Sequence, residues 1–198
     1  MDSTQLNINQ RIAEQLRVLR AGQGLSLDAL AARCGVSRSA LSLIERAQSS
    51  PTAVVLDKLA VGLGVPLAAL FSAAPAAAPA SPLQRHADQA VWQDPGSGYR
   101  RRSVSPPGHA RPLQLVEVTF PAGARVAYES GPRDCTVHQL VWVLEGALSL
   151  STGDTTHRLL VGDCLAMTLD SPNAFHNPTR KPTRYAVVVF AGHPSHRR

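Results

Sequence analysis

The sequence has few cysteines, few aromatic residues and no long hydrophobic run. Its 198 residues include three cysteines, Cys34, Cys135 and Cys164, and this odd, scattered set argues against a disulfide framework and favours a reducing compartment. No apolar stretch approaches the roughly 18 residues that a membrane span needs. The first residues also lack the basic-then-apolar order of a signal peptide. We therefore expect a cytoplasmic protein with no membrane partner.

Charge is also sparse and gives little direction. Charged residues make up 17% of the chain, and the formal net charge at pH 7 is +6. The excess of basic residues is divided between the two halves of the chain, so net charge alone is weak evidence for nucleic acid. With 44% hydrophobic residues, the chain can build one large or two small domains with packed cores.

The periodicity of the sequence changes near residue 72. Residues 1–72 have helical spacing throughout, and residues 83–198 alternate with period 2. Between them, residues 73–82 alternate Ala and Pro, which disfavours both helix and strand and predicts a semi-extended linker. Such a linker transmits little strain, so any coupling between the two parts must pass through direct contacts or through a dimer.

Five short helices are predicted in the first part. Ile12, Leu16 and Leu19 lie on one face of the first helix, and the next three helices begin after the N-cap residues Ser26, Ser37 and Thr52. The fifth helix begins at Pro66, because proline is favoured at the first helical position. Gly35 makes a tight turn between the second and third helices, which is the helix-turn-helix order.

The third of these helices has two different faces. Ala40, Leu41 and Ile44 form an apolar stripe, whereas Arg38, Ser39, Ser42 and Arg46 lie away from it. Hydroxyl and guanidinium groups are side chains that reach base edges and phosphates. An ordinary surface helix with a solvated polar face is the alternative reading of these residues alone.

The sequence GLSLDALAARCGVSRSALSLIERAQSSPTAVVLDKLAVGLGVPLAALF resembles the five-helix DNA-binding domain of lambda-repressor-like (XRE-type) transcriptional regulators. The resemblance implies that double-stranded DNA is a partner and that Ser37, Arg38, Ser39 and Ser42 face the major groove. It places the remaining DNA-binding candidates near phosphates: Ser26, Arg46, Gln48 and Thr52. Many members have glutamine just after the cap of the second helix, where this chain has Leu27, so one contact is lost or made by the backbone.

Nine short strands are predicted in the second part, which is typical of a sandwich or barrel. Turn signals containing Gly, Pro, Asn or Asp separate them. The sequence has no glycine-rich phosphate loop, nucleophile elbow or CxxC pair. The predicted strands cover residues 89–93, 99–104, 113–120, 125–129, 137–144, 147–151, 155–161, 164–169 and 184–190.

The sequence HQLVWVLEGALSLSTGDTTHRLLVGDCLAMTLDSPNAFHNPT resembles the core of a cupin. The predicted fold is thus a multidomain α and β chain, with a five-helix lambda-repressor-like domain, an Ala/Pro linker and a double-stranded β-helix (cupin) barrel. Helix-turn-helix plus cupin is a layout of bacterial regulators in which the barrel is the sensor. The resemblance also implies a homodimer, because cupins often pair through their sheets.

The positions at which metal-binding cupins place their ligands are occupied here by other residue types. They fall on Arg133, Cys135, Gln139 and Asn173, none of which is a histidine or a carboxylate. We therefore expect no metal cofactor and a pocket for a small-molecule effector, in which Arg133 binds a carboxylate. The alternatives are an Arg133 that points out at the barrel mouth with a solid interior, or a displaced metal site.

The histidines that could form a displaced site are His138, His157 and His176. His138 has the opposite strand parity to Gln139, so we expect it to face away from the pocket. The run Tyr99-Arg100-Arg101-Arg102 is another candidate for the cation that binds the ligand, although such a run is usually a solvated or edge strand with alternate arginines on opposite sides.

The leading functional prediction is a transcriptional regulator that senses an effector and has no catalytic residues. The alternative is a cupin enzyme of the isomerase or dioxygenase type with an accessory DNA-binding domain. A phage-type repressor or antitoxin without ligand fits the large second domain poorly. The effector, the operator, and the choice between repression and activation stay open at this stage.

Overall fold

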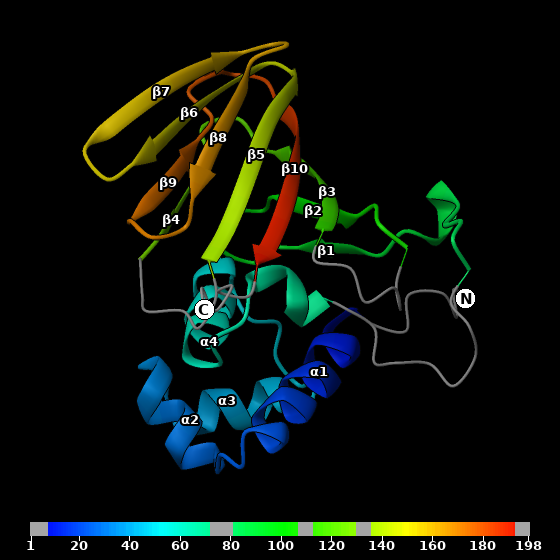
Figure 1. Cartoon of the computed structure of the whole chain (residues 1–198), viewed down its shortest axis with the longest axis vertical. Coiled ribbons are helices and arrows are strands. Elements are labelled where there is room, and N and C mark those ends of the chain that lie inside the picture. Colours follow the sequence, from blue (N-terminus) through cyan, green and yellow to red (C-terminus); the bar gives the residue numbers. More distant parts are fainter. Residues whose placement is uncertain (1–7, 72–80, 107–112, 130–135, 193–198) are drawn as a thin grey trace, which may run out of the picture.

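The computed structural model describes residues 8–71, 81–106, 113–129 and 136–192. Four α-helices come first: α1 (Ile8–Gly22), α2 (Leu27–Cys34), α3 (Arg38–Glu45) and α4 (Ala53–Gly62). They pack around buried aliphatic side chains that include Ile12, Leu16, Leu30, Leu41 and Leu56. The chain therefore begins with a compact helical domain, drawn in blue and cyan in Figure 1.

The helix starts predicted from the sequence are confirmed. The side-chain oxygens of Ser26, Ser37 and Thr52 accept from the N–H groups two or three residues into α2, α3 and α4, at 3.1, 3.2 and 3.3 Å. Gly35 closes α2 in the left-handed conformation, with φ of 62°. The predicted fifth helix is instead a 3-10 helix, η2 (Leu67–Phe71). Its five residues have the short length that is typical of 3-10 helices.

The β domain contains two antiparallel sheets (Figure 1). One sheet has the order β1-β2-β3-β10-β5-β8 and the other has the order β4-β9-β6-β7. Inward side chains such as Val118, Phe120, Val141, Leu150 and Phe175 fill the space between them. The strands are β1 (Val91–Gln93), β2 (Arg100–Ser103), β3 (Leu113–Phe120), β4 (Arg125–Tyr128), β5 (Thr136–Glu145), β6 (Ala147–Thr152), β7 (Thr155–Leu160), β8 (Cys164–Thr168), β9 (Asn173–His176) and β10 (Thr183–Gly192).

The predicted fold class is confirmed, but the prediction of nine strands was wrong by one. The missed strand is β9, whose four residues lie between Pro172 and the Asn177-Pro178 turn. A segment this short between two turn signals has too little alternation to register as a strand. β9 pairs with both β4 and β6, so it is the link that holds the four-stranded sheet together.

The helical domain packs directly against the β domain, with α4 next to β4 (Figure 1). The rings of Phe71 and Trp92 meet edge to face with centroids 5.5 Å apart. The N–H of Ala53 donates to Asp94 of the β domain at 2.9 Å. The junction is therefore a packed interface. Because a flexible linker transmits little strain, coupling between the two domains needs a direct contact of this kind. The predicted linker lies largely outside the described residues, so its boundaries stay a prediction.

No helix in the described part of the chain combines the length and the apolar character that crossing a membrane requires.

Candidate DNA-binding face and ligand cavity

The exposed face of α3 carries the predicted base-reading side chains. Leu41 and Ile44 are buried, while Arg38 and Ser39 are exposed and Ser42 is half-buried. Glu45, on the inner side, accepts from Arg20 of α1 through both carboxylate oxygens at 2.7 and 2.8 Å. This two-pronged ion pair fixes α3 against α1, so the exposed face is held by a rigid support.

Arg38 is displayed at the start of this face, beside a carboxylate. Its Nε lies 2.9 Å from Oδ1 of Asp28 on α2, and 65% of its side chain is exposed. An ion pair this exposed contributes little to stability, so it leaves Arg38 able to exchange Asp28 for another partner. Arg46, also exposed, donates from Nε to the carbonyl of Ser42 at 3.2 Å.

The remaining predicted DNA contacts are placed at helix ends and turns. Ser26 is exposed at the start of α2, and Gln48 is exposed in the turn after α3. Thr52 is half-buried at the start of α4, where the carboxylate of Asp94 already accepts from the N–H of Ala53. Their roles at DNA phosphates stay predictions. At α4, a phosphate would meet a helix start already facing a protein carboxylate.

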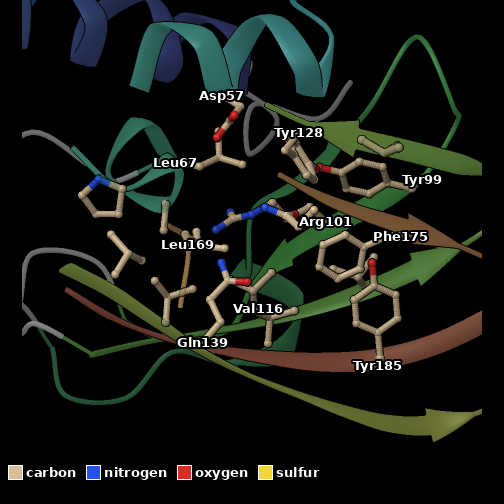
Figure 2. Close-up of a pocket in the computed structure, with 18 of the residues that line it drawn as sticks. Asp57, Leu67, Tyr99, Arg101, Val116, Tyr128, Gln139, Leu169, Phe175 and Tyr185 are labelled. Atoms are coloured by element: carbon tan, nitrogen blue, oxygen red, sulfur yellow. The ribbon is translucent and has the colours of Figure 1, made fainter. Parts of the chain in front are cut away.

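A cavity of about 80 Å³ lies where the β domain meets the helical domain (Figure 2). On the same measure one water needs about 10–15 Å³, so the cavity has room for a small organic molecule. The helical domain contributes part of the wall, through Asp57 of α4 and through Pro66, Leu67 and Ala68. Apolar and aromatic side chains from the two sheets make most of the remainder.

Arg101 of β2 brings a positive charge into this cavity. Its side chain is 6% exposed, its guanidinium carbon lies 4.1 Å from the centre of the Phe71 ring, and its Nη1 donates to Ser103 at 3.2 Å. Burial lowers the pKa of Arg101 to about 10, so the guanidinium stays charged at neutral pH. The predicted alternation of the arginine run is confirmed, because the strand position of Arg101 points inward while that of Arg100 points to solvent.

Three further polar groups face the same cavity. Asp57 is 5% exposed and comes from the helical domain, while Gln139 of β5 and Asn173 of β9 come from opposite sheets. Figure 2 shows the guanidinium of Arg101 between Asp57 on one side and Gln139 on the other. The hydroxyls of Tyr99 and Tyr128 lie 3.4 Å apart at one side of the cavity, and burial raises the pKa of Tyr99 to about 12.

The structure brings together two of the four residues predicted to form the pocket. Gln139 and Asn173 both line the cavity, whereas Arg133 and Cys135 lie outside the described residues. Arg101 belongs to the arginine run that the sequence offered only as another candidate, and Asp57 was not predicted. The signal for Arg101 was the alternation within the arginine run, and the signal for Asp57 was a lone carboxylate in the apolar helix AVVLDKLAVG.

The histidines are spread over the β domain. His138 is exposed beside Phe190 on the outer face of the six-stranded sheet, as its parity predicted. His157 and His176 are half-buried on β7 and β9 of the other sheet. Within residues 8–71, 81–106, 113–129 and 136–192, no three His, Cys, Asp or Glu side chains lie close enough to hold a metal ion together.

A helix-turn-helix domain with an exposed polar recognition helix, packed on a two-sheet β domain with an internal cavity, defines a two-domain DNA-binding protein. Comparison with known proteins agrees with this class. The helix-turn-helix domain family HTH_31 matches residues 11–71. The HTH-type transcriptional regulator SutR of Escherichia coli K12 is 28% identical over 183 residues, which span 92% of this chain and 96% of SutR.

Two solved structures are similar to the chain or to part of it. The crystal structure of an HTH_3 family transcriptional regulator from Vibrio cholerae is 26% identical, covers 92% of this chain and 96% of its own, and superposes with a TM-score of 0.70. A cupin_2 domain of an XRE family regulator from Enterobacter cloacae is 15% identical and covers 46% of this chain and 95% of its own, with a TM-score of 0.42. The chain thus has a helix-turn-helix domain followed by a cupin-like β domain, and over most of its length it is similar to helix-turn-helix transcriptional regulators.

Proposed function

We propose that this regulator binds an operator sequence through α3 and changes its operator affinity when a small carboxylate-bearing effector fills the cupin cavity. Ser37, Arg38, Ser39 and Ser42 read bases. Phosphates are bound by the remaining predicted contacts, Ser26, Arg46, Gln48 and Thr52. It acts in the cytoplasm, where the DNA is, and it is not an enzyme. Whether it represses or activates depends on where the operator lies, which the chain does not encode.

The observation that supports this proposal is the position of the cavity. Asp57 and Leu67 of the helical domain and Arg101 of the cupin line one small space, so a molecule bound there touches both domains. A ligand can shift an equilibrium only by its different affinity for two arrangements. A ligand that contacts both domains has such a difference whenever the domains move relative to each other.

Arg101 is the proposed anchor of the carboxylate. A buried guanidinium has five N–H donors in a planar fork, and a carboxylate is the partner that satisfies two of them together. Gln139 and Asn173 then donate or accept at the rest of the ligand. Arg133 and Cys135 stay proposed contacts from the segment next to β5.

We further propose that the cavity works without a metal ion. The expected ligand positions include two amides, Gln139 and Asn173, and a guanidinium charge on Arg101 repels a divalent cation. Purified protein should therefore carry well under one equivalent of zinc, iron, manganese or nickel, and a chelator should leave its melting temperature unchanged. A stoichiometric ion that survives dialysis would contradict this and would redirect attention to His138, His157 or His176.

A homodimer is proposed through the outer face of the six-stranded sheet. Five exposed apolar side chains are neighbours there across β3, β10 and β5: Leu113, Leu115, Leu140, Trp142 and Phe190. A two-fold dimer uses the same patch on both copies, and it presents two recognition helices to a two-fold operator. We call this patch the outer apolar face.

The test of the proposed function is a thermal-shift screen of small carboxylates, including amino acids, on the full chain. A hit should raise the melting temperature of the wild type and of Arg100→Met, whose side chain is exposed on the same strand, but not that of Arg101→Met. Equal stabilisation of Arg101→Met would remove this residue from the site. If no carboxylate stabilises the wild type, the effector class is wrong.

A further inference from the structure

Two opposite charges face the cavity from different domains. Arg101 and Asp57 are both more than nine-tenths buried, and Figure 2 shows them on the same cavity. Burial lowers the pKa of Arg101, and the hydroxyls of Tyr99 and Tyr128 act in the opposite direction. We propose that the effector is a zwitterion, an α-amino acid whose carboxylate binds Arg101 and whose ammonium binds Asp57.

This inference rests on the proposed function, because it names the class of molecule that fills the same cavity. The carboxylate end follows from Arg101. Phe71 covers one face of its guanidinium and Ser103 accepts from Nη1, which leaves other N–H groups of the fork to reach the cavity. A carboxylate accepts two of these in parallel.

The ammonium end follows from Asp57. A carboxylate offers about four lone-pair positions on two oxygens, so Asp57 can accept from an ammonium in addition to the interactions it already makes. Burial is the main reason that the pKa of Tyr99 and of Tyr128 is raised, and the charge of Asp57 adds to the shift at both hydroxyls, as expected if Asp57 lies at the same end of the cavity as these two rings. An ammonium has three donors and fits such a surrounding of carboxylate and hydroxyl oxygens.

Charge balance separates a zwitterion from simpler ligands. A plain carboxylate would bring a second anion into a small, buried space that already holds Asp57, and like charges in low dielectric repel strongly. A plain amine would meet Arg101 in the same unfavourable way. A molecule with both charges places its anionic end at Arg101 and its cationic end at Asp57, so neither end meets a like charge.

The rest of the cavity fits an apolar side chain of modest size. Val116, Val187, Leu169 and Phe175 surround the polar groups, and the free space of about 80 Å³ limits the ligand to a small molecule. Because Asp57 belongs to α4, the DNA-binding domain supplies one of the two charged contacts. An α-amino acid would therefore bridge the two domains.

The experiment uses the full chain and the common L- and D-α-amino acids as probes, with calorimetric titration of the best binder. Its two matched analogues, one lacking the amine and one lacking the carboxylate, are titrated alongside. We expect each analogue to bind at least about 30-fold more weakly than the amino acid. Equal binding of the analogue without the amine overturns the zwitterion but leaves the proposed carboxylate effector standing. If simple carboxylates bind but no amino acid does, the zwitterion is likewise overturned and the carboxylate effector stands. If none of the compounds binds, both proposals are overturned.

The variant Asp57→Asn assigns the ammonium contact. It should weaken the amino acid by at least about 30-fold and leave the weaker binding of the analogue without the amine unchanged or improved, which also shows that the variant is folded. Asp154→Asn makes the same chemical change at an exposed turn position and should have no effect. If Asp57→Asn weakens both compounds equally, or neither, the ammonium is not at Asp57.

Discussion

At the scale of single residues, the proposed DNA contacts are side chains that are exposed but held on a fixed helix. Arg38 lies one residue after the N-cap of α3, at the end of the helix that enters the groove in this class of domain. Asp28 holds its guanidinium before DNA binds. The exposed ion pair costs little to break, so a base edge or a phosphate can replace Asp28.

Arg38→Ala should weaken operator binding by about 1–3 kcal/mol and relax base preference at one position in each half-site. Arg46→Ala should weaken binding to all DNA sequences about equally. It should also reduce the slope of log affinity against log salt concentration by about one unit. The measurement is fluorescence-anisotropy titration on an operator obtained by selection from random DNA and on a scrambled control. If Arg38→Ala weakens both DNAs equally, its contact is to the backbone and not to a base.

Residue-level prediction from the sequence succeeded where local chemistry decides the position. Ser26, Ser37 and Thr52 cap their helices because a short hydroxyl side chain satisfies a nearby free N–H, whatever the rest of the fold does. Arg101 could not be preferred to Arg133 from the sequence, because strand parity separates alternate arginines but does not say which set faces inward. That depends on how β2 pairs with β3 and packs under Phe71, which is tertiary information.

At the scale of elements, α2 and α4 approach each other very closely. A Cβ built on Gly62, the last residue of α4, would lie 2.2 Å from the Sγ of the buried Cys34. The absence of a side chain at Gly62 therefore permits this helix contact. Burial raises the pKa of the Cys34 thiol to about 11, which keeps it a neutral packing group.

Gly62→Ala should destabilise the protein by about 1–3 kcal/mol, because the added methyl overpacks the contact with Cys34. In a Cys34→Ala background the same change should cost less than about 1 kcal/mol, since alanine is the better helix former and the sulfur has gone. Urea unfolding of the four proteins of this cycle measures the coupling. Independent, additive effects would show that the two residues do not meet as described.

The loop after β1 connects the two domains through Asp94. This carboxylate accepts from Ala53 at the start of α4, and also from the N–H and hydroxyl of Ser97 at 2.8 and 2.6 Å. Asp94→Ala leaves these donors without their acceptor in a buried place and should cost about 1–3 kcal/mol of unfolding free energy. Ser97→Ala keeps the bond to α4 and should cost less. A larger loss for Ser97→Ala would show that the turn, and not the link to α4, carries the stability.

Most elements were predictable from the sequence, and the exceptions have a common cause. Long elements such as α1 and β3 can be predicted from the regular spacing of their apolar residues alone. β9 and η2 are each five residues or fewer, and they adopt their conformation because neighbouring strands and helices hold them. Their structure is set by packing, so the sequence alone could not show it.

At the scale of the whole molecule, dimer formation should depend on the outer apolar face. Trp142 lies at one corner of it, on β5, and is 51% exposed, which is unusual for so large an apolar side chain unless another surface covers it. Trp142→Arg should convert a dimer to a monomer in light-scattering measurements and weaken operator binding, because a monomer reaches one half-site only. Leu160→Arg, which changes an exposed leucine at the end of β7 in the other sheet, is the matched control. A wild type that is monomeric, or a Trp142→Arg variant that stays dimeric, contradicts the assignment.

The arrangement of the two domains was the least predictable feature. An Ala/Pro linker indicates separation, yet α4 and η2 form part of the cavity wall, and Phe71 covers Arg101. The contact of Arg101 with Phe71 joins a cation and an aromatic ring that are far apart in the sequence. The proposed ligand site and the helix-turn-helix domain therefore share α4, so under the proposed function the two can influence each other without any strain in the linker.

The most direct test of this account is operator affinity measured with and without a saturating ligand of the cavity. The account predicts a change of about 5- to 150-fold, and it predicts that operator DNA changes the ligand's dissociation constant by the same factor. Both titrations use the full-length wild type, and Arg101→Met should lose the change while keeping its operator affinity without ligand. A ligand that binds the wild type tightly, yet leaves operator affinity unchanged, would contradict the account.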